Sequence, residues 1–392
     1  MSIKTMEGNR RWWVLALLCL SRTGLGFQFQ TMGSVSEHIV AELHLNYTEI
    51  GTLIGLFMLP GMFLTIPAGF ASRFASDRWL TGSGLIVLGI GGAIAAVAED
   101  FGMLAVGRVA CGAGFVVSLL YFMKMVADWF SGRELATAMG LLVMTWPLGI
   151  AMGQVGHEWL ADTFEWRSAF AVAAIYCFAA GALVLLTYRS PQGAIATGIL
   201  STWRLPRREL VLTVLASLVW GMFNAGYIVY LSFAPKVLMV GGFKPMEAAA
   251  TIGLGSLVMM LSGALCGQVA DRTGRNDLIL YICTASAVLA LLMLPFTDYA
   301  IGISLFFGLL GMAPAGVIMA LTGEAMAPER RAFGMGVFLA GYFVLAAPAP
   351  AIAGALYDIK GDPYWPILFG AALFAAAAAA NAVFRLVQRR LS

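Results

Sequence analysis

The chain has 392 residues, of which 60% are hydrophobic and 11% charged, and its formal net charge is +3. A soluble globular domain carries about 25% charged residues, whereas this chain repeats apolar runs of about 20 residues, the length a helix needs to cross a bilayer. The composition excludes an ordinary soluble protein and predicts a polytopic membrane protein that lies in the lipid bilayer.

The apolar runs predict an all-α membrane protein with twelve transmembrane helices. In the first half of the chain we expect these spans at residues 12–36, 47–70, 79–98, 101–127, 134–158 and 166–187. In the second half we expect them at residues 209–238, 246–270, 278–297, 299–324, 332–356 and 364–386.

A stretch that contains Pro191, Pro206 and four arginines separates the two sets of spans. Proline and clustered basic residues are typical of a linker rather than of a membrane span. We therefore predict three parts, namely an N-terminal six-helix bundle at 1–187, a cytoplasmic linker at 188–208 and a C-terminal six-helix bundle at 209–392.

The placement of lysine and arginine predicts the orientation. Seventeen of the 24 basic residues fall on the side of the chain termini, and four fall on the opposite side. Because lysine and arginine concentrate in cytoplasmic loops, we expect both termini in the cytoplasm and the protein in the inner membrane of the cell. Three basic residues fall inside spans: Arg22, Arg108 and Lys124.

Several short segments recur at an interval of about half the chain. The loop 267–276 reads GQVADRTGRN, and a weaker copy, GFASRFASDR, begins 198 residues earlier at Gly69. Asp128 and Glu324, at the ends of the fourth and tenth spans, are 196 residues apart. Parallel repeats of this kind bind a solute near the bilayer midplane, where the two halves meet, and rock around it.

The loop from Gly267 to Arg275 resembles the G-x-x-x-D-R-x-G-R loop of the major facilitator superfamily. Arg108-Val-Ala-Cys-Gly112-Ala-Gly114 is similar to the R-x-x-x-G-x-G motif of that superfamily. In the first-half copy of the loop, which begins at Gly69, Arg73 stands where the family usually has aspartate. With its Trp146-Pro147-Leu148-Gly149 stretch and its short linker, the chain resembles the cyanate and nitroimidazole-type transporters within the superfamily. The resemblance implies the major facilitator fold and transport by alternating access.

Arg22 is the deepest charge of the first span. It lies ten residues after Trp12, about 15 Å along a helix and thus near the midplane. The resemblance implies that the first span lines the cavity, where Arg22 could hold a carboxylate and Gln28 and Gln30 would add amide groups. The alternative is that Arg22 bonds to backbone carbonyls or to a buried acid and holds helices together.

Arg108 and Lys124 are the other two charges within spans. In the superfamily the arginine of this motif bonds to neighbouring backbone and is linked to proton coupling, which we favour for Arg108 over ligand contact. Lys124 and Asp128 are spaced i and i+4, which predicts a helix-surface ion pair. A role for Lys124 in attracting an anion to the cytoplasmic mouth is the alternative.

The charged residues at the inner ends of the spans suggest a gate. The resemblance implies that such contacts latch the halves together when the protein faces outward. The alternative is a set of solvated loop charges. The candidate gating residues in these loops and ends are Lys124, Asp128, Asp271, Arg272, Arg275 and Glu324, and Arg108 is the candidate for coupling. On the outer side, Glu37 and His38 form a pair that could respond to pH, although a plain surface pair would fit the same sequence.

Amphipathic aromatic residues complete the predicted substrate site. Trp220, Asn224 and Tyr227 share one face of the seventh span, and Tyr342 corresponds to Trp146 at an interval of 196 residues. Tyr121 lies in the fourth span. Such side chains suit a solute with both apolar and hydrogen-bonding surface, but they are equally typical of a packed helix bundle.

Two deep cations without an acid near the midplane favour an anionic solute. We therefore predict a secondary active transporter of a small organic anion, coupled to protons or to a counter-substrate. The alternative is a proton-driven multidrug or toxicant efflux antiporter. The sequence contains no enzyme motif, so we expect no catalysis, no cofactor, no metal, no nucleic-acid partner and a monomer.

Overall fold

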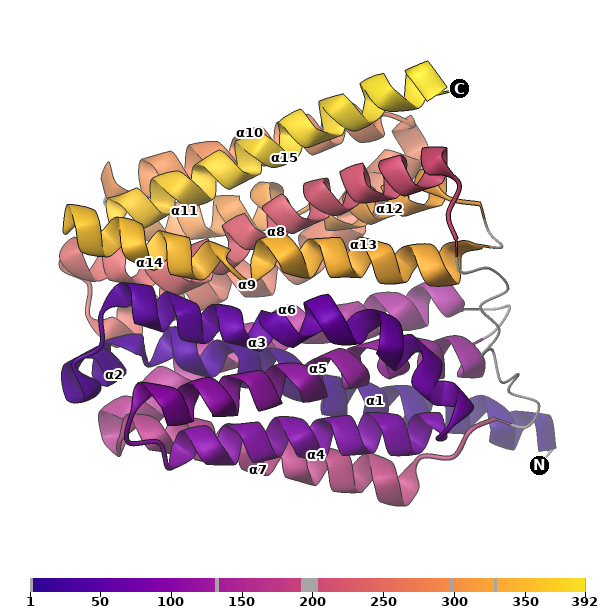
Figure 1. Cartoon of the computed structure of the whole chain (residues 1–392), viewed down its shortest axis with the longest axis horizontal. Coiled ribbons are helices and arrows are strands. Elements are labelled where there is room, and N and C mark those ends of the chain that lie inside the picture. The colour runs from indigo at the N-terminus through magenta and orange to yellow at the C-terminus, as the bar shows by residue number, and fades with distance from the viewer. Residues whose placement is uncertain (1–2, 131–133, 192–203, 297–298, 328–329, 392) are drawn as a thin grey trace.

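The computed structural model describes residues 3–130, 134–191, 204–296, 299–327 and 330–391, and the described chain is all-α (Figure 1). Eleven of its helical stretches are long and apolar enough to cross a membrane. The helices of the first half are α1 (Ile3–Ser34), α2 (Ser36–Leu43), α3 (Tyr47–Phe70), α4 (Asp77–Ala96), α5 (Phe101–Trp129), α6 (Leu135–Thr163) and α7 (Trp166–Thr187). Those of the second half are α8 (Arg207–Val240), α9 (Pro245–Thr273), α10 (Asn276–Met293), α11 (Ala300–Phe306), α12 (Ala315–Ala325), α13 (Arg331–Ala346), α14 (Ala349–Lys360) and α15 (Tyr364–Leu391).

The helices follow the predicted spans closely, and α3 and α7 have the predicted bounds. The first predicted span corresponds to α1, which lies outside the set of eleven and carries Arg22, Gln28 and Gln30 among its apolar residues. Its helix starts at Ile3, nine residues before the predicted start. The short helix α2 follows α1 directly and, except for Ser36, lies outside the predicted spans.

The tenth and eleventh predicted spans are interrupted. A π-helical turn, η3 (Phe307–Gly311), and a turn before Pro314 separate α11 from α12. Ala347 and Pro348 separate α13 from α14. Proline lacks an N–H group and its ring clashes with the preceding turn of a helix, so the chain bends at these positions.

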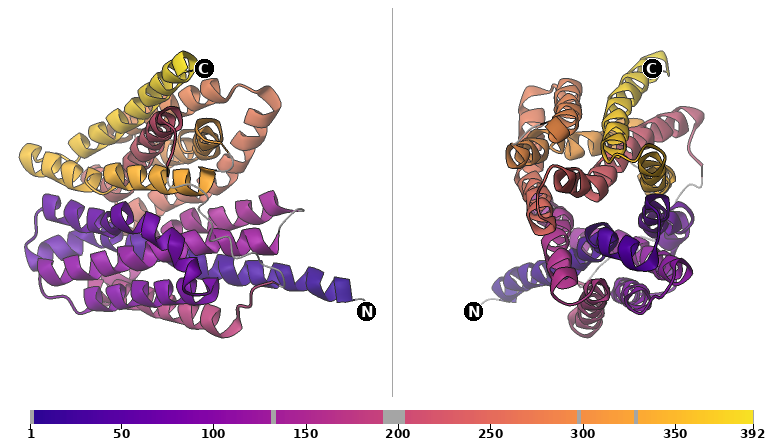
Figure 2. Two further views of the ribbon diagram at one scale, coloured as in Figure 1. Left: turned by 45° about the vertical axis from the view of Figure 1, so that its right-hand side comes forward. Right: turned by 90° about the vertical axis from the view of Figure 1, so that its left-hand side faces the viewer.

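The helices form two groups that lie side by side in Figure 1 and in both views of Figure 2. We call α1–α7 the N-terminal group and α8–α15 the C-terminal group. Within the groups the closest packing joins α4 to α5, α1 to α6 and α8 to α15. Between the groups α3 packs against α13 and α14, and α6 packs against α9.

Both chain ends lie at the same end of the molecule (Figure 1). We call this end the terminal end and the opposite end, where α2 lies, the α2 end. Of the linker predicted at 188–208, residues 192–203 lie outside the described residues.

Glycine allows α3 and α14 to approach each other closely at the α2 end. A Cβ atom on Gly51 would lie 2.0 Å from the carbonyl oxygen of Pro350, and one on Gly354 would lie 1.9 Å from that of Tyr47. No side chain fits at either position without a shift of backbone. Close approach of this kind is a regular use of small residues between membrane helices, and here it joins the two groups.

Candidate functional site

Hydrogen bonds and an ion pair join the two groups at the α2 end. Asp358 of α14 accepts bonds from the backbone N–H groups of Tyr47 and Thr48 at 3.0 and 2.7 Å, and from the Thr48 hydroxyl at 2.6 Å. Lys236 of α8 forms an ion pair with Glu37 of α2 and donates to the Tyr47 hydroxyl. The N-terminal and C-terminal groups are therefore tied together at this end.

The predicted gating residues lie at the terminal end, where the ion pairs join helices of the same group. Lys124 bonds Asp128 at 2.9 Å, as its spacing predicted, and also pairs with Asp77 of α4. Glu324 pairs with Arg385 of α15, which also bonds Asp277 at 2.8 Å. Within the described part of the chain, the ion pairs of these residues therefore stay inside one group and do not join the two groups.

The remaining loop residues of the predicted gate are exposed. Asp271 and Arg272 lie in the last turn of α9, and Arg275 precedes α10. Gly274 ends α9 in the left-handed conformation, with φ of 65°, which glycine adopts without strain. This part of the family motif thus serves the turn between two helices of one group.

Arg108 is fully buried and bonds to backbone, as the resemblance implied. Its Nε donates to the Leu53 carbonyl at 3.1 Å, and Nη2 donates to the Phe29 carbonyl at 3.3 Å. Nη1 donates to the Gln28 carbonyl and to the Thr31 hydroxyl. The guanidinium carbon lies 4.7 Å from the centre of the Phe57 ring, so Arg108 ties α1 and α3 to α5.

Arg22 is buried, with 4% of its surface exposed, and faces α6. Its Nη1 donates to the Leu142 carbonyl at 2.6 Å and to the Thr145 hydroxyl at 2.9 Å. Its Nε is buried and has no hydrogen-bond partner among the described residues. One side of the guanidinium therefore holds α6, as the alternative interpretation has it, while the Nε side remains unsatisfied.

The two glutamines of α1 point to different neighbours. Gln28 is buried against α5, where its Nε2 lies 3.5 Å from the Cys111 sulfur. Gln30 bonds to Gln154 of α6, which also donates to the Leu231 carbonyl of α8 at 3.4 Å. Gln30, unlike Gln28, thus belongs to a polar network that reaches the C-terminal group.

The predicted aromatic residues divide into two sets. Tyr121 and Tyr227 are buried, and each hydroxyl bonds inside its own group. The Tyr121 hydroxyl donates to the Ala68 carbonyl at 2.7 Å, and the Tyr227 hydroxyl lies 3.1 Å from that of Ser256. The other members are half-buried, and the Tyr342 hydroxyl contacts the Met58 sulfur across the boundary between the groups. The half-buried set, which offers aromatic and amide surface, is Trp146, Trp220, Asn224 and Tyr342.

The half-buried rings lie against other aromatic rings. The ring of Trp146 lies 5.4 Å from those of Phe29 and Phe115. Trp220 lies 6.4 Å from Tyr342. The structure therefore builds one aromatic cluster in each group, and in the N-terminal group Phe57 joins the cluster to the guanidinium of Arg108.

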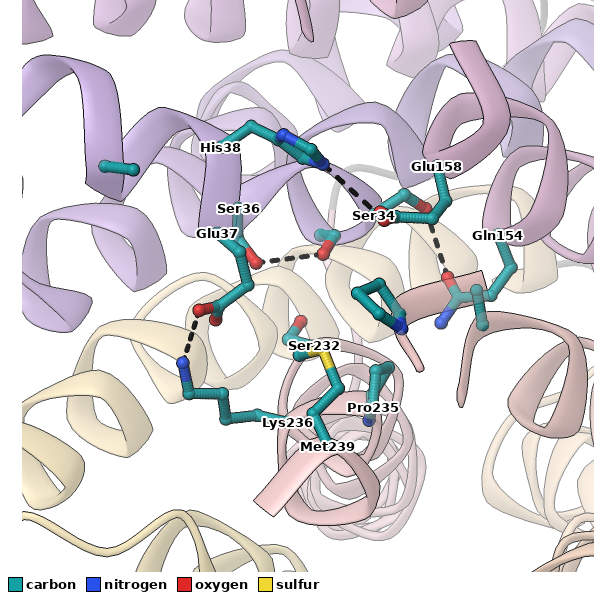
Figure 3. A pocket seen from close by; sticks show the side chains of 14 residues that line it. Ser34, Ser36, Glu37, His38, Gln154, Glu158, Ser232, Pro235, Lys236 and Met239 are labelled. Atoms are coloured by element: carbon teal, nitrogen blue, oxygen red, sulfur yellow. Dashed lines mark hydrogen bonds and ion pairs between the residues drawn. The ribbon is translucent and has the colours of Figure 1, made fainter. Parts of the chain in front are cut away.

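A cavity of about 190 Å³ lies at the α2 end between the two groups (Figure 3). His38 and Glu158 form an ion pair at 3.5 Å on one side of it. The bond to Glu158 raises the pKa of His38 above its usual value. Fourteen residues from α1, α2, α6, α8 and α9 line the cavity.

The sequence interpretation missed Lys236, Gln154 and Asp358 as parts of these contacts. The ion pair of Glu37 with Lys236 joins the ends of the first and seventh spans, which the repeat relates to each other. Opposite charges at repeat-related ends could have indicated this contact. Asp358 had no comparable signal, because two of its three donors are backbone N–H groups.

The chain matches the profile of the Major Facilitator Superfamily over residues 14–323, which is most of its length. Together with the membrane-length helices, this match shows that the chain belongs to the Major Facilitator Superfamily. It is therefore a multi-pass membrane protein of a transporter family rather than an enzyme.

Two curated relatives illustrate the similarity. The chain is 29% identical to an MFS-type transporter of Aspergillus terreus over 41% of its own length, and the match spans 29% of that protein. It is 26% identical to an MFS-type efflux pump of Mycolicibacterium smegmatis, over 96% of this chain and 91% of that protein.

Among solved structures, the fold resembles a bacterial homolog of the human lysosomal transporter Spinster in an inward-facing, occupied conformation. The TM-score is 0.76 at 17% identity, and the similarity covers 97% of each chain. At this identity the likeness supports the fold and leaves the cargo open.

Proposed function

We propose that the protein is a secondary active transporter of a small organic anion, and that the unsatisfied side of Arg22 anchors the anion. The observation that carries this proposal is the buried Nε of Arg22 without a partner. Among the described residues no carboxylate forms an ion pair with Arg22. A buried cation without a counter-charge is costly in a membrane, and a bound anion would remove that cost.

The surroundings of Arg22 support an aromatic carboxylate as cargo. A guanidinium binds a carboxylate through two parallel hydrogen bonds. Thr145, which accepts from Arg22, is followed directly by Trp146, whose half-buried ring packs on Phe29 and Phe115. The charged anchor on α1 is thus bonded to the residue of α6 that directly precedes the apolar wall.

We propose that the structure is the inward-facing state of an alternating-access cycle. The bonds of Asp358 and the Glu37–Lys236 pair join the groups at the α2 end, and the excess of basic residues at the terminal end favours a cytoplasmic location for it. In this proposal the predicted bundles, 1–187 and 209–392, rock about their boundary on twelve spans that include α1. The latch of Asp271, Arg272 and Glu324 then forms when the protein opens outward.

Proton-driven efflux of an amphipathic compound is the second candidate. It is favoured by the uncharged aromatic, amide and sulfur groups of Trp220, Asn224, Tyr342 and Met58, and by the relative named as an efflux pump. A cyanate-type cargo, which the Trp146-Pro147 stretch suggests, would be a small anion of the first class, whereas a nitroimidazole carries no permanent negative charge and would not belong to it.

Transport in proteoliposomes distinguishes the two candidates. The probes are radiolabelled benzoate and ethidium, each tested with and without a pH gradient. The anion proposal predicts benzoate uptake that Arg22→Gln abolishes and that Arg10→Gln, an exposed arginine of the same helix, leaves unchanged. Ethidium transport that is insensitive to Arg22→Gln, with no benzoate uptake, would support efflux and contradict the anion proposal.

A further inference from the structure

The cavity at the α2 end is amphipathic (Figure 3). It lies about 16 Å along α1 from Arg22, given the rise of 1.5 Å per residue to Gly33. One part of its lining is polar and comes from α1, α2 and α6, with Ser34, His38, Gln154 and Glu158. The facing part comes from α8 and α9, and beside Ser232 and Lys236 it contains apolar side chains: Pro235, Met239, Pro245 and Ala249.

The two carboxylates of the cavity differ in how they are compensated. Glu37 has two partners, since it accepts from the Tyr47 hydroxyl and pairs with Lys236. Glu158 is buried, with 7% of its surface exposed, and its ion-pair partner among the described residues is His38, at 3.5 Å. The charge on Glu158 is therefore balanced only while His38 carries a proton. Neutral His38 leaves a buried carboxylate that faces an open cavity.

A buried carboxylate without a counter-charge is strongly disfavoured. A positive charge can reach Glu158 in two ways, either as a proton on His38 or as a cation in the cavity. The apolar lining near Pro235 and Met239 suits the body of an organic ligand, and a volume of about 190 Å³ admits a small one.

We propose that this cavity is a binding site for a small amphipathic organic cation, a primary ammonium held by Glu158, and that protonation of His38 displaces it. This site is separate from the proposed anion site at Arg22, and the proposal does not depend on the cargo. Because both groups line the cavity, a bound cation also holds the protein closed at the α2 end.

The groups around His38 set the direction of the competition. Glu158 and Asp162 of α6 and Glu37 of its own helix favour the protonated ring, and burial opposes it, while Lys236 of α8 is itself paired with Glu37. Acidic conditions therefore place a proton on His38 and satisfy Glu158. Alkaline conditions leave Glu158 free for the organic cation.

Equilibrium binding of benzylammonium to the purified full-length protein tests the site, with benzyl alcohol as the neutral probe of the same shape. Measurements run between about pH 5.5 and about pH 8, where histidine titrates and benzylammonium stays charged. We expect binding to tighten as the pH rises, and benzyl alcohol to bind at least about tenfold more weakly at about pH 8.

Single substitutions test whether Glu158 binds benzylammonium and whether His38 causes the pH dependence. Glu158→Gln should weaken benzylammonium binding at least about tenfold at the higher pH, whereas Asp162→Asn, which removes an exposed carboxylate from the same helix, should retain tight binding. His38→Gln should keep the binding and lose its pH dependence. Unchanged binding in Glu158→Gln, equal binding of benzyl alcohol, or tighter wild-type binding at low pH would each overturn the proposal. If Glu158→Gln fails to fold, the wild-type pH profile and the neutral probe still decide.

Discussion

The close contact of α3 with α14 allows a direct test of the closed α2 end. Replacing Gly51 by alanine puts a Cβ atom 2.0 Å from the Pro350 carbonyl oxygen, and real Cβ atoms essentially never lie closer than 3.0 Å to such an atom. The helices must therefore separate by about 1 Å. Overpacking of this size costs about 1–3 kcal/mol.

That cost falls on the state in which α3 and α14 touch. If the α2 end opens during transport, Gly51→Ala shifts the equilibrium toward the open state by about 5- to 150-fold. Gly69→Ala is the matched control, because it lies in the same helix and its added Cβ meets nothing within 4 Å.

Distances between two nitroxide labels report the shift. The labels are placed on cysteines at Glu99 and Ile359, two exposed positions in opposite groups, in a protein without its native cysteines. We expect a longer distance in Gly51→Ala and the parent distance in Gly69→Ala. A Gly51→Ala protein with the parent distance distribution and the parent thermal stability would refute the reasoning.

Three further predictions concern individual contacts. Asp358→Asn should also favour opening at the α2 end, by about 1 kcal/mol because the carboxylate is exposed, and an unchanged label distance would contradict this. Arg108→Lys should lower the free energy of unfolding by about 1–3 kcal/mol, because the three lysine donors cannot reach all the acceptors of the guanidinium; thermal unfolding in detergent measures it, and wild-type stability would count against the assigned bonds. The His38–Glu158 pair should stabilise the folded protein below the usual pKa of histidine, and this contribution should be lost as the pH rises through the raised pKa of His38. Its loss appears as a fall in Tm on raising the pH that is absent in His38→Gln, and a Tm that rises equally in both proteins would exclude the pair as its cause.

The helices were largely predictable from the sequence, because apolar length is a direct consequence of the bilayer thickness. The bounds of α3 and α7 agree with the predicted spans. The breaks near Pro314 and Pro348 were not predicted, since an apolar run conceals a local bend.

The site was less predictable, because periodicity tells which face a residue occupies and not which neighbour it meets. Arg22 and Arg108 were both recognised as deep cations, yet Arg108 uses its donors on carbonyls and Arg22 keeps one free. Backbone carbonyls leave no trace in the sequence, so only the packed structure distinguishes the two arginines. The same holds for Asp358, whose acceptor role depends on the start of α3.

The most direct test of the anion proposal is equilibrium binding of radiolabelled benzoate to the purified protein and to Arg22→Lys. Lysine keeps the charge but lacks the planar fork that binds a carboxylate through two bonds. We predict saturable binding to the wild type that weakens at least about tenfold in Arg22→Lys, with binding retained in Arg10→Lys. Equal benzoate binding by the wild type and Arg22→Lys, both folded, would contradict the role of Arg22.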